Sequence, residues 1–257
     1  MNFPASPTQL YLDLLKKSLS GLIYEDAPSQ VFPIGLLTAK APNGFVRLFR
    51  EHGRDVPGCA HSSIGLRRLD NIQYCLETVL QDSIPGDLIE TGVWRGGATI
   101  LMRGVLKAYG ITDRQVWVAD SFEGLPVPDT KHYPLDQFWV KNTGKLAVTQ
   151  QEVSRNFALY GLLDDQVRFL PGWFKETLPD APIERLAVLR LDGDLYQSTL
   201  DALTHLYPKL SLGGFVIIDD FGLESCRQAV NDYRNAQAIK EPIQTIDWTG
   251  VYWRRSV

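Results

Sequence analysis

The sequence predicts an α/β fold: an open, mostly parallel β-sheet with helices on both faces, preceded by a helical extension. Short apolar runs alternate with helical patterns from residue 86 onward, which is typical of successive βαβ units. Each run is apolar almost throughout, as expected of a strand that helices cover on both faces. Several runs end in acidic residues, and open sheets of this class bind ligands at the carboxyl ends of their strands.

The predicted strands follow one another at intervals that leave room for a helix between most of them. They are DLIETG (87–92), VWVAD (116–120), VRFL (167–170), LAVLRLD (186–192) and GFVIIDD (214–220). A helix around 223–236 comes next, and then PIQTIDW and GVYWRRS on either side of a Thr-Gly turn. These last two stretches predict a terminal hairpin added to the parallel strands.

Residues 1–85 are expected to form a helical extension or lid that packs on a core at 86–257. Leucines at helical spacings in 8–23, and a second apolar stripe in 62–80, predict two amphipathic helices. The stretch 27–58 between them contains proline and glycine and has no strong period beyond a helix near 44–52. It is therefore expected to be a covering segment.

Composition favours a protein that acts on small molecules. The chain has 257 residues, 44% of them apolar, and a formal net charge of −4 without a run of basic residues. These values allow a large core and argue against a nucleic-acid partner. The three cysteines have no metal-ligand spacing, which fits a reducing, cytoplasmic setting. No apolar run approaches the roughly 20 residues of a membrane span, so no membrane partner is expected.

A glycine-rich turn, ETGVWRGG at 90–97, follows the first predicted strand. It matches neither the dinucleotide fingerprint nor the P-loop, and a tight strand-to-helix turn explains it equally well. Asp120 ends the second strand, where an acid can accept hydrogen bonds from both ribose hydroxyls of a nucleoside. Because the turn opens with Glu90, a cationic or sulfonium ligand suits it better than a pyrophosphate. S-adenosylmethionine is thus favoured over NAD, although Asp120 could instead cap a helix.

Acidic residues end two more strands. Asp192, Asp219 and Asp220 offer oxygen ligands from strands that would be neighbours in this topology, and such ligands favour Mg²⁺, Mn²⁺ or Ca²⁺ over zinc. Ordinary turn or capping roles are the alternative. Asp194 lies two residues beyond Asp192, so in an extended chain both carboxylates would point to one side. Asp194 could then accept the proton of an alcohol whose pKa a cation has lowered.

A long insertion with several prolines, residues 121–150, follows the second strand. Long loops at the ligand-binding edge are often lids. Tyr133, Phe138 and Trp139 could stack on the acceptor, or they could pack within the loop or against another subunit. No GxSxG or Cys/His arrangement supports a covalent nucleophile, so direct transfer between two bound substrates is the simplest mechanism.

Read together, these motifs resemble the macrocin O-methyltransferase family, which includes mycinamicin- and novobiocin-type sugar methyltransferases. The resemblance runs from about Leu10 to the C-terminus. It is carried by DLIETGVWRGG, VWVADSFEGLP, YGLLDDQVRFLPGWFKETLP, LAVLRLDGDLYQST, GGFVIIDD and GVYWRRS.

This resemblance implies a class I methyltransferase fold, with a seven-stranded sheet whose last strand is antiparallel. It implies an S-adenosylmethionine- and Mg²⁺-dependent O-methyltransferase that acts on a deoxysugar hydroxyl of a glycoside. Mn²⁺ is the alternative metal, and a homo-oligomer is the implied assembly. Asp192, Asp219 and Asp220 would bind the metal, and Asp194 would be the general base. The residues expected to line the cofactor are Ser63, Glu90, Thr91, Gly92, Val93, Trp94, Gly96, Asp120, Ser121, Gly172 and Trp173.

Two stretches, 126–150 and 31–43, depart from the pattern of the family. These are the segments expected to contact the acceptor, so the sugar and its aglycone stay open. A catechol-like phenol is an alternative acceptor, because its adjacent oxygens could also bind a metal. A nucleoside-binding module without catalytic activity is a second alternative.

Overall fold

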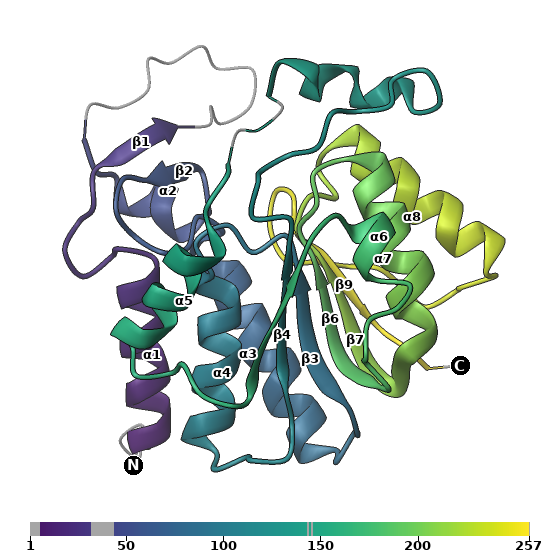
Figure 1. Cartoon of the computed structure of the whole chain (residues 1–257). Helices are drawn as coiled ribbons and strands as arrows, with labels where there is room; N and C mark the ends of the chain where they lie inside the picture. Colours follow the sequence, from purple (N-terminus) through teal and green to yellow (C-terminus); the bar gives the residue numbers. More distant parts are fainter. Residues whose placement is uncertain (1–5, 32–43, 143, 145, 257) are drawn as a thin grey trace.

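The computed structural model describes residues 6–31, 44–142, 144 and 146–256. A seven-stranded sheet lies between two layers of helices (Figure 1). The first layer contains α1 (Pro7–Leu19), α3 (Gly65–Gln81), α4 (Gly97–Ala108) and α5 (Gln150–Leu159). The second contains α6 (Phe174–Thr177), α7 (Tyr196–Leu206) and α8 (Glu224–Ala236). The predicted fold class is confirmed.

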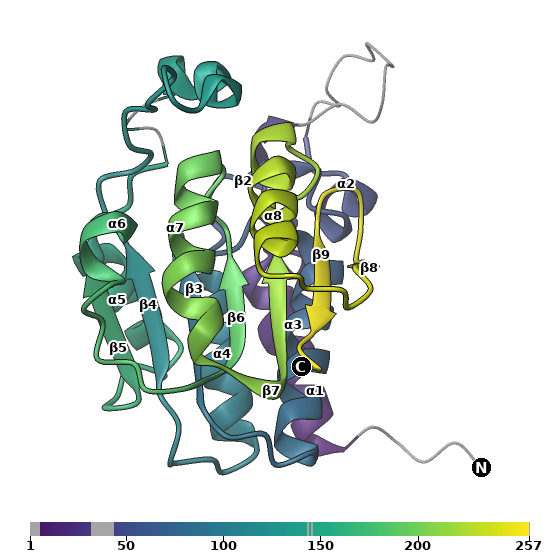
Figure 2. The ribbon, with the colours of Figure 1, turned by 90° about the vertical axis from the view of Figure 1, so that its right-hand side faces the viewer.

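The strands of this sheet lie in the order β5-β4-β3-β6-β7-β9-β8. Their bounds are β3 Asp87–Thr91, β4 Val116–Asp120, β5 Val167–Pro171, β6 Leu186–Leu191, β7 Leu210–Ile218, β8 Gln244–Thr245 and β9 Val251–Arg254. Strands β3 to β7 pair in parallel, whereas β9 pairs antiparallel with both β7 and β8. Figure 2 shows the arrowheads of β4 and β6 at one edge and β9 running the other way. The antiparallel last strand and the hairpin are as predicted.

The two faces of the sheet contribute to two separate hydrophobic clusters. Leu88, Val188 and Ile217 belong to the cluster under α1, α3 and α4, and their chain neighbours Ile89 and Leu189 belong to the cluster under α7 and α8. Side chains alternate between faces along a strand, so strands that are buried on both sides become apolar almost throughout. This alternation also decides to which side a polar residue near a strand end will point.

The N-terminal segment packs against the first helical layer and reaches the carboxyl edge of the sheet, the edge at which the parallel strands end. Leu12, Leu15 and Leu19 of α1 are buried in the cluster that also contains residues of α3 and α4. A short antiparallel ribbon of β1 (Pro28–Val31) and β2 (Asp55–Pro57) follows, together with α2 (Arg47–Glu51). Figure 1 places this ribbon beyond the carboxyl edge. The sequence did not predict its strands, which are short and contain proline.

The insertion after β4 also lies beyond the carboxyl edge, and it contains the 3₁₀ segment η1 (Pro134–Asn142) (Figure 1). Two contacts attach it to the start of α7. The ring of Tyr133 stacks on Tyr196 with 4.9 Å between the centroids, and Asp136 accepts a hydrogen bond from the Tyr196 backbone N–H at 2.9 Å. A second 3₁₀ turn, η2 (Tyr207–Lys209), links α7 to β7. None of the described helices combines the length and apolar character that a membrane span requires.

Candidate active site

A cavity of about 980 Å³ opens at the carboxyl edge of the sheet. Its walls come from the turns after β3 to β7, from the N-terminal extension, from the insertion and from the turn before β9. In strand order, the residues at this edge that line it are Gly172 and Trp173 (β5), Asp120 and Ser121 (β4), Gly92 and Trp94 (β3), Asp192 and Asp194 (β6), Asp219 and Asp220 (β7), and Trp248 and Thr249 (β9). Six of the residues predicted for the cofactor therefore lie on one side, and the carboxylates follow them along the edge.

The turn after β3 depends on a glycine at position 92. Gly92 has a φ of +85°, and a Cβ atom there would lie 1.8 Å from the carbonyl oxygen of Asp192. Only glycine combines this left-handed conformation with so close an approach. The turn after β3 and the end of β6 are therefore in direct contact, which brings the predicted cofactor residues beside the acids.

Asp120 organises the turns around it. One carboxylate oxygen accepts a hydrogen bond from the Val93 N–H at 2.7 Å, and the other accepts from the Phe122 N–H at 2.8 Å. In the described part of the chain, the next helix after Asp120 is η1, which begins at Pro134. Asp120 therefore does not cap a helix, which was the predicted alternative role. The oxygen that accepts from Phe122 also accepts a long hydrogen bond of 3.5 Å from the Ser121 hydroxyl. A carboxylate offers about four acceptor sites and Asp120 lines the cavity, so it can accept a hydrogen bond from a ligand there.

Asp192, Asp219 and Asp220 come together as the sequence predicted. Each offers one carboxylate oxygen, and these three atoms lie within 4.8 Å of one another. Asp194 is adjacent, because its backbone N–H donates a hydrogen bond of 3.0 Å to Asp220. The three-carboxylate group has the all-oxygen composition that Mg²⁺ and Mn²⁺ prefer.

Crowding of these acids perturbs their protonation. Burial, and next the charge of Asp219, raises the pKa of Asp192 to about 6. Burial and the charges of Asp192 and Asp219 raise the pKa of Asp194 to about 8. The pKa of Asp220 is raised for the same reasons, burial first and Asp194 next. Groups that are held so close together with raised pKa values are a common mark of a functional site.

The path from Asp192 to Asp194 differs from the extended chain that the sequence analysis assumed. Strand β6 ends at Leu191, and Asp194 has a φ of +58° in the left-handed region. The two carboxylates therefore do not reach the same side by strand alternation, and the prediction that they do is wrong. Asp194 nevertheless lines the same cavity, because the turn folds its side chain back towards the acid group.

Two buried arginines lie among the acids. Arg190, in β6, donates hydrogen bonds to Glu90, Asp192 and Asp219. Arg68, in α3, donates to Asp219 and Asp247 and lines the cavity. Neither arginine was predicted from the sequence. For Arg190 a signal was available, because a guanidinium inside an apolar strand is too costly to bury without acidic partners.

Several predicted site residues do not lie on the cavity wall. Four residues of the turn expected to line the cofactor are buried and are not among the lining residues: Glu90, Thr91, Val93 and Gly96. Tyr133, predicted for the acceptor, stacks on Tyr196 instead of lining the cavity. The side chains of Phe138 and Trp139 lie outside the part of the chain that is described. Ser63, also predicted for the cofactor, lines the cavity.

The aromatic side chain of Trp248 was not predicted for the site. It lies in the turn before β9, is 40% exposed and lines the cavity. Its indole N–H donates to the carbonyl oxygen of His52 at 2.8 Å, and the guanidinium of Arg54 lies 4.0 Å from the ring centroid. These contacts tie the N-terminal extension to the C-terminal hairpin beside the acids.

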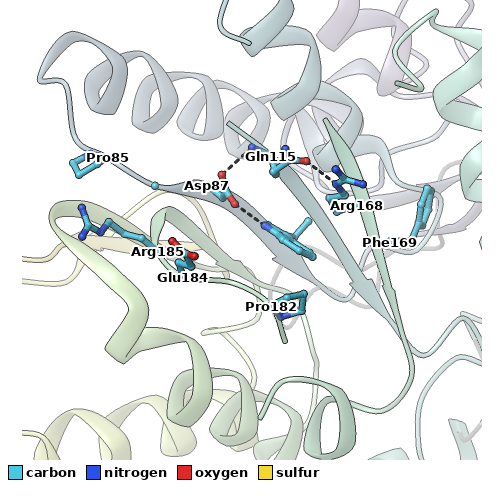
Figure 3. A pocket seen from close by; sticks show the side chains of 10 residues that line it. Pro85, Asp87, Gln115, Arg168, Phe169, Pro182, Glu184 and Arg185 are labelled. Atoms are coloured by element: carbon cyan, nitrogen blue, oxygen red, sulfur yellow. Dashed lines mark hydrogen bonds between the residues drawn. The ribbon is translucent and has the colours of Figure 1, made fainter. Parts of the chain in front are cut away.

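A second cavity, of about 810 Å³, lies at the opposite edge of the sheet near the starts of β3, β4 and β5 (Figure 3). Asp87 accepts hydrogen bonds of 2.9 Å from the backbone of Gln115 and from the indole of Trp117. Arg168 donates to the side chain of Gln115, also at 2.9 Å. Because these polar groups bind one another at the amino ends of the strands, the first cavity is the better candidate for an active site.

Comparisons with known proteins agree with this arrangement. The sequence pattern of the macrocin-O-methyltransferase (TylF) family matches residues 8–255. The 8-demethyl-8-(2,3-dimethoxy-alpha-L-rhamnosyl)-tetracenomycin-C 4'-O-methyltransferase of Streptomyces olivaceus is 58% identical over 96% of this chain and 93% of its own length. Mycinamicin III 3''-O-methyltransferase of Micromonospora griseorubida is 53% identical over 98% and 99%. The structure of the O-methyltransferase NovP is similar with a TM-score of 0.89 and 50% identity, over 97% of this chain and all of that one.

Proposed function

The chain belongs to the macrocin O-methyltransferase family and has a class I Rossmann-like methyltransferase fold, and on that premise we propose that it is a sugar O-methyltransferase. It would transfer a methyl group from S-adenosylmethionine to a deoxysugar hydroxyl of a glycosylated natural product, with the help of Mg²⁺. The observation that carries this proposal is the convergence of Asp192, Asp194, Asp219 and Asp220 beside the wall that contains Gly92 and Asp120. The relative from Streptomyces olivaceus, whose name gives a rhamnosyl-tetracenomycin as its substrate, supports the acceptor class.

The methyl donor would bind along the turns after β3, β4 and β5. Asp120 would accept hydrogen bonds from the ribose hydroxyls, and the bare backbone at Gly92 and Gly172 would allow close approach. Trp94 and Trp173 offer aromatic surface on the same side of the cavity. A donor held here would direct its sulfonium towards the acids, where negative charge favours it.

The donor set of the acids fits a divalent cation. Asp192, Asp219 and Asp220 supply three carboxylate oxygens and no softer ligand, and Mg²⁺ binds through a few carboxylates while it keeps other positions for water or substrate. When bound, the cation would lower the pKa of an acceptor hydroxyl. It would also lower the raised pKa of Asp194, because an opposite charge nearby favours the ionised form.

Asp194 would then be the general base. Its carboxylate accepts the hydroxyl proton as the acceptor oxygen forms the new bond to the methyl carbon and the bond from that carbon to sulfur breaks. A positioned base contributes roughly 10²–10⁴-fold to rate. Alignment of oxygen, methyl carbon and sulfur within the cavity contributes further, because the reacting atoms are held in one geometry.

We further propose that residues 1–85 help to close the site over the core at 86–257. The extension contributes Gly53, Val56, Ser63 and Arg68 to the cavity wall. The insertion contributes the stretch from Gly124 to Asp129 on the other side. An acceptor would thus lie between two segments that both extend beyond the sheet.

A methyl-transfer assay tests the proposed function. The purified protein is incubated with S-adenosylmethionine and MgCl₂, and the acceptors are a tetracenomycin rhamnoside and a macrolide glycoside with free sugar hydroxyls, beside a panel of catechols. Mass spectrometry should show one added methyl group on a glycoside, and EDTA should abolish it. Methylation of catechols alone would refute the sugar assignment, and unchanged activity after thorough chelation would refute the metal requirement.

A further inference from the structure

Arg190 and Arg68 form a buried pair of cationic side chains behind the acid cluster. Arg190 is fully buried and Arg68 is 4% exposed. The two guanidiniums hold both oxygens of Asp219: Arg190 donates to Oδ1 and Arg68 donates to Oδ2. Arg190 also holds one oxygen of Asp192, at 2.9 Å. Arginine side chains thus hold two of the three proposed metal ligands, Asp192 and Asp219.

The sheet places Arg190 where it can reach all its partners. In the parallel register it lies opposite Glu90 on β3 and Ile217 on β7. Strand alternation puts Asp192, two residues after Arg190, and Asp219, two residues after Ile217, on the same face. Helix α3 covers this face and brings Arg68 to it. The contact is therefore a product of the fold and does not depend on a flexible loop.

Ion pairs of this kind contribute little to stability. Removing two guanidiniums and several carboxylates from water is costly, and apolar side chains of similar volume would often stabilise a fold as well. A role in the geometry of the site explains their presence better. The planar guanidinium presents its donors in a fixed fork, so it sets the direction of a carboxylate in a way that a lysine ammonium cannot.

We propose that Arg190 and Arg68 are positioning residues that orient Asp219 and Asp192 for a divalent cation. This inference rests on the proposed function, because it assumes that these carboxylates bind Mg²⁺. Residues hydrogen-bonded to metal ligands typically account for 10- to 100-fold in metal affinity. The arginines keep the carboxylate oxygens in one arrangement, and Arg190, which is fully buried and does not line the cavity, acts only through these oxygens.

Calorimetric titration of the purified protein with MgCl₂, without methyl donor or acceptor, tests this inference. Arg190→Lys keeps the positive charge and removes the fork, so it separates orientation from charge. We expect its dissociation constant for Mg²⁺ to rise about tenfold or more, while the dissociation constant for S-adenosylmethionine changes less than about twofold.

Arg103→Lys is a matched control. Arg103 is also buried, at 5% exposure, and it makes a two-bonded ion pair with Asp164 at 2.9 and 2.6 Å, away from the cavity. A merely structural role for Arg190 predicts that both variants lose thermal stability and bind Mg²⁺ as the parent protein does. The positioning role predicts weaker Mg²⁺ binding in Arg190→Lys alone.

The possible outcomes separate this inference from the proposed function. If the parent protein binds no Mg²⁺, the metal site and this inference both fail. If the parent binds Mg²⁺ and Arg190→Lys binds it equally well, only the positioning role fails. If circular dichroism shows that Arg190→Lys does not fold, Arg68→Lys decides by the same criterion, because Arg68 lines the cavity and holds the other oxygen of Asp219.

Discussion

Gly92→Ala is the substitution whose effect the structure determines most closely. An alanine at a φ of +85° is strained by about 1 kcal/mol, because its Cβ approaches the carbonyl oxygen. That Cβ would also lie 1.8 Å from the Asp192 carbonyl oxygen, whereas real Cβ atoms essentially never come closer than 3.0 Å. The end of β3 and the end of β6 must therefore move apart by more than an ångström.

This movement disturbs two backbone hydrogen bonds, both 2.9 Å long. They are Gly92 N–H to Ala119 O and Asp192 N–H to Thr91 O, each with a net contribution of about 1 kcal/mol. With the strain, we expect Gly92→Ala to lower the free energy of unfolding by about 3 kcal/mol. Because Asp192 is displaced, Mg²⁺ affinity should also fall.

Urea unfolding with linear extrapolation measures the change in stability. Gly110→Ala is the control, because Gly110 has a φ of +67° and no heavy atom lies within 4 Å of the added Cβ. It should show only the backbone strain of about 1 kcal/mol. Equal losses in the two variants would refute the argument that β3 and β6 are in obligatory contact at Gly92.

Three further outcomes are expected. Asp194→Asn should keep its affinity for S-adenosylmethionine and lower turnover at least about tenfold; a variant of full rate would remove Asp194 from the role of base. Mg²⁺ affinity, measured by calorimetry at several pH values, should fall as the pH drops through 8 towards 6, because burial raises the pKa of Asp192 to about 6 and that of Asp194 to about 8. Below these values a proton occupies the carboxylate and competes with the cation, so an affinity independent of pH would contradict the assignment. Asp136→Ala removes the acceptor for the Tyr196 N–H at the start of α7 and should lower the free energy of unfolding by about 1 kcal/mol. Proteolysis within residues 121–142 should be faster than in the parent protein. Equal cleavage rates would show that this contact does not hold the insertion.

Features that depend on residues close together in the chain could be predicted from the sequence. The run LAVLRLDGD contains an apolar strand and the acids that end it, so both Asp192 and its strand could be predicted from one short segment. Asp219 and Asp220 follow another strand in the same way. The rule that parallel strands end at a common edge then brought these acids together without further information.

Features that depend on distant contacts were missed. Arg68 is separated by 151 residues from Asp219 and by 179 from Asp247, and no local pattern distinguishes it from Arg67 beside it. Glu90 was expected at the cofactor, because a sequence does not show that the residue opposite it across the sheet is Arg190. Burial behind that arginine raises the pKa of Glu90 to about 8, despite the favourable charge of Arg190.

The walls of the cavity extend along the chain from Gly53 to Thr249. During synthesis from the N-terminus, Trp248, Thr249 and β9 are therefore made after every other part of the wall. Asp247, which also holds Arg68, is one of the last parts of the site to be added. A partly synthesised chain that ends before Asp247 would thus contain every acidic residue of the cluster and yet lack the wall that Trp248 and Thr249 form.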